Sequence, residues 1–233
     1  MGGDVRVAIA DDSALFREGL AMLLNAAGVQ VIAQAAEPDK ILAHIADEPP
    51  DVVILDMRMP PTFTNEGLVT AERIRGLHPG VGVLVLSTYA DIRYAVRLLG
   101  DGRGGTGYLL KDRVEDVGNL LDGLRRIADG RLVVDEEIVA GLLTHRRKAE
   151  ALDRLTRRER AVLREMAEGR SNAGIAVRLH LAAKTVENHV ASVFTKLEMP
   201  VSGDDNRRVL AVLAWLRSSG GVVPHSPEGP PAP

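Results

Sequence analysis

Two adjacent aspartates and a third, distant one each follow a short apolar run, which is a pattern that can do chemistry. Asp11 and Asp12 come directly after VAIA, and Asp56 comes directly after VVIL. Clustered carboxylates repel one another and raise each other's pKa unless a cation lies among them. An all-oxygen set of ligands is the type that Mg²⁺ prefers. These residues therefore predict a magnesium site, provided that the ends of the two apolar runs meet.

A hydroxyl and an ammonium group stand at corresponding places further along the chain. Ser87 follows VLVL, and Lys111 follows GYLL. A carboxylate can act as a nucleophile and form an aspartyl phosphate. A metal ion and a lysine can neutralise the charge on the transferring phosphoryl group. Each residue alone reads as an ordinary polar strand end, but together they predict phosphoryl transfer to Asp56, assisted by Ser87 and Lys111.

The elements that must position these residues alternate through the first half of the chain. Apolar runs predict strands at 5–10, 29–34, 51–55, 81–86 and 107–110, and amphipathic segments predict helices at 13–27, 38–46, 66–77, 91–99 and 114–128. This alternation predicts a five-stranded parallel sheet with helices on both faces, a flavodoxin-like α/β fold. Ligands of such sheets bind at the carboxyl ends of the strands, where the polar residues fall.

The second half of the chain reads as purely helical. Thr156 and Glu159 form a capping box that opens a first helix, and Ser171 can cap a short second one. A turn at 180–182 leads into a third helix at 183–197, and a last helix is expected at 206–217. Two short helices joined by a tight turn, the second exposing polar residues, are typical of a helix-turn-helix.

The third helix of this half has an apolar and a polar face. Its apolar residues recur at helical spacing and are expected to face the core: Val186, Val190, Val193, Phe194 and Leu197. The polar face supplies the candidate DNA contacts: Lys184, Thr185, Glu187, Asn188, His189, Ser192 and Lys196. Asn188 suits adenine, and the lysines suit phosphates. Spacing alone leaves open a helical packing module with a polar surface.

Composition limits the classes of protein. The 233 residues include no cysteine, which excludes disulfides and thiolate zinc sites. With no apolar run of about 18 residues and no signal peptide, we expect a cytoplasmic protein without a membrane partner. The net charge of −3 divides unevenly: residues 1–150 carry 17 − 23 = −6 and residues 151–217 carry 12 − 8 = +4. This asymmetry hints that the second half works near an anion.

Residues 5–129 resemble the receiver domains of two-component response regulators. The resemblance lies in Asp11-Asp12, the LDMRMP segment around Asp56, Ser87 and the GYLLKD segment. It implies that a sensor histidine kinase phosphorylates Asp56 and that Ser87 bonds the phosphoryl group. It also implies that Asp12 binds Mg²⁺ directly, Asp11 through water and Arg58 through its backbone carbonyl. Tyr108 would be the aromatic residue whose rotamer reports the switch. The PPTFTNEGL loop after Asp56 is longer than usual in the family.

LTRRERAVLREMAEGRSNAGIA and KTVENHVASVFTKLEM resemble the LuxR-type output domain, so the whole resembles a NarL/FixJ-type regulator. The expected division is a receiver at 1–129, a linker at 130–151, a LuxR-type helix-turn-helix domain at 152–218 and a disordered tail at 219–233. Ala182 stands where a capping serine is usual, Gly174 interrupts a helix, and Ala191 replaces a basic residue. We therefore expect DNA affinity that depends on dimerisation.

The expected function is that of a transcriptional regulator and not an enzyme. Phosphorylation of Asp56 would favour a homodimer that binds double-stranded promoter DNA, with the last helix and Trp215 as the expected dimer contact. RNA polymerase is a further candidate partner. Two other classes stay open: a phosphorylation-dependent interaction adaptor, and a magnesium-dependent aspartyl-phosphate phosphatase. The phosphatase class usually carries DxD, whereas Asp56 is followed by Met57-Arg58.

Overall fold

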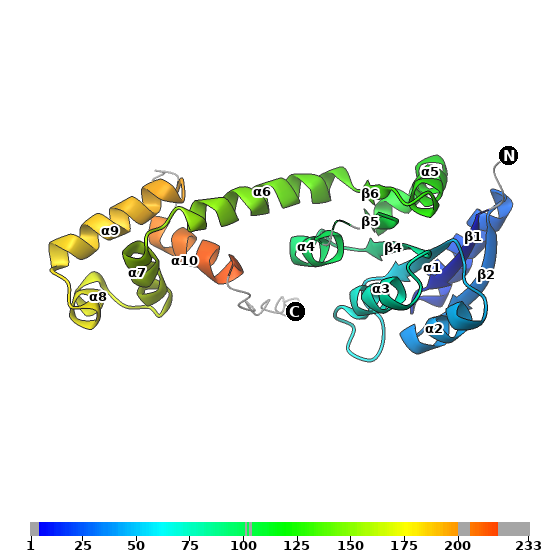
Figure 1. The fold of residues 1–233 in the computed structure, drawn as a ribbon, viewed down its shortest axis with the longest axis horizontal. Coiled ribbons are helices and arrows are strands. Elements are labelled where there is room, and N and C mark those ends of the chain that lie inside the picture. The colour runs from blue at the N-terminus through cyan, green and yellow to red at the C-terminus, as the bar shows by residue number, and fades with distance from the viewer. Residues whose placement is uncertain (1–4, 101, 103, 200–205, 219–233) are drawn as a thin grey trace, which may run out of the picture. The chain divides into compact units, whose positions relative to one another are not determined.

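The computed structural model describes residues 5–100, 102, 104–199 and 206–218 (Figure 1). It divides into two compact units, Met1–Leu143 and Thr144–Pro233. The segment predicted as a disordered tail, 219–233, lies outside the described residues. Strands in the first unit are β1 (Arg6–Ala10), β2 (Gln30–Ala35), β3 (Val52–Asp56), β4 (Gly82–Ser87), β5 (Thr106–Leu110) and β6 (Leu132–Val134). Its helices are α1 (Ala14–Ala26), α2 (Pro38–Asp47), α3 (Glu66–Leu77), α4 (Ile92–Leu99) and α5 (Val117–Ala128), and α6 (Glu136–Asp153) begins there.

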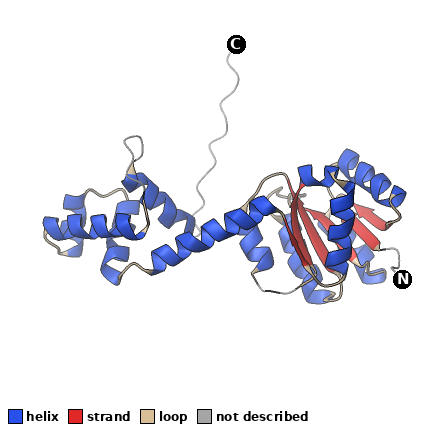
Figure 2. Cartoon of the chain, turned by 90° about the horizontal axis from the view of Figure 1, so that it is seen from above, coloured by secondary structure: helices blue, strands red, loops and turns tan. Residues whose placement is uncertain are grey.

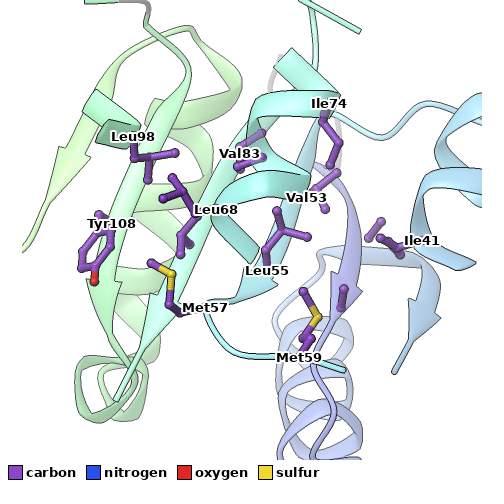
Figure 3. Close-up of a cluster of buried hydrophobic side chains, with 14 of the residues drawn as sticks. Ile41, Val53, Leu55, Met57, Met59, Leu68, Ile74, Val83, Leu98 and Tyr108 are labelled. Carbon is purple, nitrogen blue, oxygen red and sulfur yellow. The ribbon is translucent and has the colours of Figure 1, made fainter. Parts of the chain in front are cut away.

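The strands of the first unit form one sheet, drawn in red in Figure 2. Their order is β2-β1-β3-β4-β5-β6, and every neighbouring pair is parallel. Successive residues of the central strand β3 point to opposite faces, so all five of its residues are buried. Val53 and Leu55 belong to one apolar core with residues of α2, α3 and α4 (Figure 3). Val52 and Ile54 belong to a second core with residues of α1 and α5. The predicted parallel α/β fold is confirmed.

The predicted strand count was wrong by one, because β6 pairs with β5 from Thr106 opposite Leu132 to Tyr108 opposite Val134. Three residues are too short a run to be recognised as a strand in the sequence. They are a strand because their backbone pairs with β5, not because of a hydrophobic pattern. The region predicted as a linker, 130–151, thus contains β6 and most of α6.

One helix also begins later than expected. The sequence pattern placed its start at Val114, but a 3₁₀ turn occupies Lys111–Glu115 and α5 starts at Val117. The Asp116 carboxylate accepts a hydrogen bond from the Asn119 backbone N–H at 3.0 Å, which caps the helix and fixes its start. The turn leaves Lys111 directly at the end of β5.

The second unit is helical throughout its described residues. It contains the end of α6, then α7 (Arg157–Ala167), α8 (Asn172–Leu179), α9 (Ala183–Lys196) and α10 (Arg207–Ser218). Both sides of the predicted capping box are present: Thr156 accepts from the Glu159 N–H and Glu159 accepts from the Thr156 N–H. Ser171 caps α8 as predicted, and Ala182 leaves α9 without a side-chain cap. His180, with φ 53°, makes the tight turn between α8 and α9.

The last helix supports the core of this unit. Ala211 is fully buried, and Val212 and Trp215 pack against the core formed by α7, α8 and α9. Val209 on the same helix is exposed. The expected dimer contact through α10 stays a prediction, since the structure contains a single copy of the chain.

Candidate functional site

The three aspartates meet at the carboxyl edge of the sheet. Asp11 follows β1 and Asp56 ends β3, and because these strands are neighbours their ends lie side by side. Carboxylate oxygens of Asp11, Asp12 and Asp56 lie within 4.8 Å of one another. Asp11 and Asp56 are buried, while Asp12 is exposed. A divalent cation that approaches from the solvent side could bind these carboxylate oxygens.

Lys111 bridges the two buried carboxylates. Its Nζ atom lies 2.7 Å from Asp11 Oδ2 and 2.9 Å from Asp56 Oδ1. Burial raises the pKa of the Asp56 carboxyl and the other two aspartates act in the same direction, whereas Lys111 lowers it. Burial would lower the pKa of Lys111, but the bonds to both carboxylates leave it raised. The ammonium therefore stays charged and compensates part of the negative charge of the cluster.

Residues at the start of α1 make further contacts with Asp11 and Lys111, which the sequence did not predict. The Ser13 backbone N–H donates to Asp11 Oδ1 at 2.9 Å, and the Arg17 guanidinium donates to the Asp11 carbonyl at 2.6 Å. The Phe16 ring lies under the Lys111 ammonium, 4.5 Å from ring centroid to Nζ. No motif marks these contacts, because they depend on how α1 returns to the end of β5.

Ser87 ends β4, the strand next to β3, as predicted. Its hydroxyl donates to the Tyr89 carbonyl at 2.8 Å and accepts from the Tyr89 N–H at 3.3 Å. The hydroxyl is thus bonded to its own loop and not to the Asp56 carboxylate. A bond from Ser87 to a phosphoryl group on Asp56 would require the hydroxyl to leave Tyr89.

Tyr108 lies on β5 and is fully buried beside Met57, Leu68 and Leu98 (Figure 3). Its hydroxyl makes no hydrogen bond of ordinary geometry with the described residues. Burial raises its pKa, while the nearby Ser87 side chain and Asp91 backbone act in the opposite direction. An unpartnered buried hydroxyl loses the hydrogen bonds that it would make with water, which is a free-energy cost of about 1–3 kcal/mol. The switch role expected of Tyr108 stays a prediction.

The loop after Asp56 is ordered by two contacts. The Glu66 carboxylate accepts hydrogen bonds from the backbone N–H groups of Thr62 and Thr64, at 3.1 and 2.8 Å. Gly67 N–H donates to the Met57 carbonyl at 3.1 Å, which brings the start of α3 against the end of β3. The Arg58 side chain lies over the Tyr89 ring at 5.7 Å. The metal contact expected of the Arg58 carbonyl stays a prediction.

The polar face of α9 carries most of the expected DNA contacts. Lys184, Glu187 and Asn188 are exposed, and Thr185 and His189 are partly exposed. Lys184 pairs with Glu187 at 3.1 Å on the surface, a contact of small energy that a phosphate can displace. The core positions predicted on the other face are buried, with Phe194 only partly so.

Ser192 and Lys196 differ from the expectation that they share the outer surface of α9. The Ser192 hydroxyl donates to Glu159 Oε1 at 2.6 Å, and Lys196 Nζ bonds Glu159 Oε2 at 2.7 Å. Burial would raise the pKa of Glu159, but hydrogen bonds from Lys196, Ser192 and other donors lower it to about 2. The sequence showed Glu159 as a capping residue, but its second role as the link from α7 to α9 was missed.

Both units match known families. The response regulator receiver domain matches residues 7–122, and the luxR family of bacterial regulatory proteins matches residues 153–214. The oxygen regulatory protein NreC of Staphylococcus haemolyticus is 31% identical over 205 residues, which are 84% of this chain and 92% of NreC. This chain belongs to the NarL/FixJ-type response regulators. NreC of Staphylococcus aureus strain USA300 is 30% identical over 203 residues, 83% of this chain and 91% of NreC.

Solved response regulators share the fold. The RcsB response regulator of Salmonella typhimurium aligns with a TM-score of 0.58 and 23% identity, covering 93% of this chain and 100% of that one. An RcsB–DNA complex aligns with a TM-score of 0.57 and 23% identity, covering 93% and 99% of the two chains. At 23% identity, these alignments show that the chain and RcsB share a fold.

Membership of this family makes the chain a DNA-binding transcription regulator and not an enzyme. The phosphatase alternative is therefore set aside, in agreement with the missing second aspartate after Asp56. Among the described residues, none of the helices of this response regulator is both long and apolar enough to cross a bilayer.

Proposed function

We propose that this response regulator is phosphorylated on Asp56 by a sensor histidine kinase, and that the phosphoryl group controls its binding to promoter DNA. The observation that carries the proposal is the bridge made by Lys111 between Asp11 and Asp56. It combines a buried nucleophile with a fixed positive charge. Promoter DNA as the ligand would place the protein in the cytoplasm.

The donor set fits Mg²⁺. Three carboxylates converge on one point, and Lys111 compensates only part of their charge. Asp11, Asp12, Asp56 and the Arg58 backbone carbonyl would hold the ion. When bound, Mg²⁺ would supply further neutralisation of the phosphoryl oxygens during transfer.

Asp56, Lys111 and Ser87 have different roles in the proposed phosphoryl transfer. An Asp56 carboxylate oxygen forms the bond to phosphorus as the bond from phosphorus to the donor's leaving group breaks. The Lys111 ammonium bonds an oxygen of the transferring group. The Ser87 hydroxyl turns away from the Tyr89 carbonyl and donates to a phosphoryl oxygen. The loop after β4 thereby loses this hydrogen bond when the phosphoryl group arrives.

The same movement links the phosphoryl group to the rest of the receiver. Ser87 holds the loop that leads into α4, and Tyr108 packs beneath α4 beside Leu98. A phosphoryl group adds about 1.5–2 negative charges and several strong acceptors. Release of the loop biases the receiver toward a second conformation that favours the homodimer.

The dimer would place two α9 helices in successive major grooves. Half-sites of helix-turn-helix dimers lie about one helical turn apart. Asn188 is exposed and suits bidentate contact with adenine, and Lys184 suits a phosphate. The charge of +4 (12 − 8) over residues 151–217 favours an anionic partner.

The phosphoacceptor is tested with the full-length chain, a small phosphodonor such as acetyl phosphate, and Mg²⁺. Wild type is expected to gain one acid-stable, base-labile phosphate, and Asp56→Asn is expected to gain none, because the amide is not a nucleophile. Asp51→Asn, at the opposite end of β3, is the matched control and should be labelled like wild type. Equal labelling of the Asp56→Asn variant would contradict the proposal.

Salt dependence separates DNA binding from the adaptor alternative, in which the helical unit binds RNA polymerase or another protein. Contacts to DNA phosphates make affinity fall steeply as salt rises. Asn188→Ala should weaken binding to the preferred promoter more than binding to unrelated DNA, whereas Lys184→Ala should weaken both and reduce the salt slope. Affinity that ignores salt would favour the adaptor.

A further inference from the structure

The Lys111 ammonium has a third neighbour that the proposed function does not use. Its Nζ atom lies 4.5 Å from the centroid of the Phe16 ring, in addition to its bonds with the two carboxylates. Phe16 is partly buried and packs against the core beneath α1 and α5. Phe16 therefore contacts both the Lys111 ammonium and the core.

The position of this ring is fixed by the start of α1. The Ser13 hydroxyl accepts a hydrogen bond from the Phe16 N–H at 3.4 Å and caps the helix. Arg17, the next residue, donates to the Asp11 carbonyl at 2.6 Å. The first turn of α1 is thus tied to the same loop that carries Asp11, so the ring and the carboxylates share one rigid frame.

We propose that Phe16 is a positioning residue for phosphoryl transfer, acting through Lys111. The negative face of an aromatic ring attracts a cation, most strongly where water is partly excluded. Lys111 has a long, flexible chain, and its side chain is 20% exposed, so the carboxylates alone leave it room to swing toward solvent. The attraction to the ring opposes that movement and keeps the ammonium beside the Asp56 carboxylate.

This inference rests on the proposed function and concerns the rate of transfer, not the binding of the donor. Leucine at position 16 keeps apolar volume but has no π face, whereas tyrosine keeps the face. Phe16→Leu should lower the rate constant for phosphorylation of Asp56 by acetyl phosphate about 3- to 10-fold, at an unchanged half-saturating donor concentration. Phe16→Tyr should stay within about twofold of wild type.

Two controls isolate the contact. Leu15, the neighbouring residue on α1, is 86% exposed, and Leu15→Ala should leave the rate with a small donor unchanged. In a Lys111→Ala background, Phe16→Leu should cause no further loss, because the ring then has no ammonium to hold.

A second readout needs neither Mg²⁺ nor phosphorylation. The ring should shift the NMR signals of the Lys111 Cε methylene protons upfield in wild type and in Phe16→Tyr, and Phe16→Leu should remove the shift. If wild type is labelled on Asp56 but Phe16→Leu reacts equally fast, or loses as much in the Lys111→Ala background, the inference is wrong while the proposed function stands. If wild type takes up no phosphate on Asp56, both are wrong.

Discussion

Single residues in this protein serve two elements at once, and Glu159 is the example in the helical unit. Its carboxylate closes the capping box of α7 and also bonds Ser192 and Lys196 of α9. The side chain is only 6% exposed, so these charge-assisted bonds are made away from most of the solvent. Glu159 therefore fixes how α9 packs on α7.

Replacing Glu159 by Gln should destabilise the helical unit by about 1.5–3 kcal/mol at neutral pH, as expected for lost bonds to charged groups. Because the folded pKa, about 2, lies below the ordinary value of 4.5, the stability that the carboxylate contributes is complete above pH 4.5. It is lost as pH falls toward 2, and the variant should lack this part of the pH dependence. Urea unfolding followed by fluorescence of the single tryptophan, Trp215, measures it.

Glu168→Gln is the matched control for that experiment. Glu168 lies at the end of the same helix and is exposed, so its replacement should change stability by less than about 0.5 kcal/mol. Equal effects of the two substitutions would show that the bonds from Glu159 to α9 contribute nothing.

Residues at strand ends could be predicted from the sequence, whereas their neighbours could not. Asp56, Ser87 and Lys111 each end an apolar run, and the parallel sheet brings such ends together. Phe16 and Glu159 carry no such mark, because their partners lie far along the chain and only tertiary packing brings them close. For the same reason, the sequence placed Ser192 and Lys196 on the outer surface of α9.

At the scale of elements, the contact between β3 and α3 holds Asp56, the proposed phosphoacceptor, in place. A Cβ atom added at Gly67 would lie 2.0 Å from the Asp56 carbonyl oxygen and 2.9 Å from Met57 Cα. Both neighbours are backbone atoms and cannot turn aside. The glycine is thus required by close packing and not by an unusual φ angle.

Gly67→Ala should destabilise the receiver by about 1–3 kcal/mol, as for overpacked cores, and should slow phosphorylation of Asp56. Gly76→Ala in the same helix is the matched control, because an added Cβ there meets nothing within 4 Å. It should stabilise the receiver by about 0.5–1 kcal/mol. Urea unfolding followed by circular dichroism measures both, and a neutral Gly67→Ala would contradict the packing argument.

The caps of α8 and α9 give a second prediction at this scale. Ala182 has the backbone angles of an N-cap, φ −68° and ψ 145°, but lacks a side-chain acceptor. Ala182→Ser should therefore stabilise the helical unit by about 1 kcal/mol, by accepting from the first turn of α9. Ser171→Ala should cost a similar amount, because Ser171 accepts from the Gly174 N–H at 3.2 Å. Urea unfolding followed by Trp215 fluorescence measures both variants, whose changes in the free energy of unfolding should have opposite signs.

The spacing of apolar residues predicted which segments are helices and which are strands. The elements that it missed, β6 and the 3₁₀ turn, have physical causes. The α/β alternation and the four helices after residue 154 appear in the structure. β6 was missed because three residues show no period, and only its backbone pairing with β5 identifies it as a strand. The 3₁₀ turn after β5 was missed because the Asp116 cap, not apolar spacing, decides where α5 begins.

At the scale of the whole molecule, an acidic first unit carries Asp56, the proposed phosphoacceptor, and a basic second unit carries α9. A single helix, α6, starts in the first unit and ends in the second. Ile138 near its start is buried in the receiver core, and Leu152 near its end is buried in the core of the helical unit. The boundary between units therefore falls within a helix, where no Gly- or Pro-rich segment reveals it.

The most direct test of the central claim is the affinity of the full-length chain for its selected promoter fragment, measured with and without acetyl phosphate and Mg²⁺. Wild type is expected to bind at least about tenfold more tightly with the phosphodonor, a change of about 1.4 kcal/mol. Asp56→Asn should bind with one weak affinity in both conditions. Tightening of equal size in Asp56→Asn, or none in a fully phosphorylated wild type, would contradict control of DNA binding by Asp56.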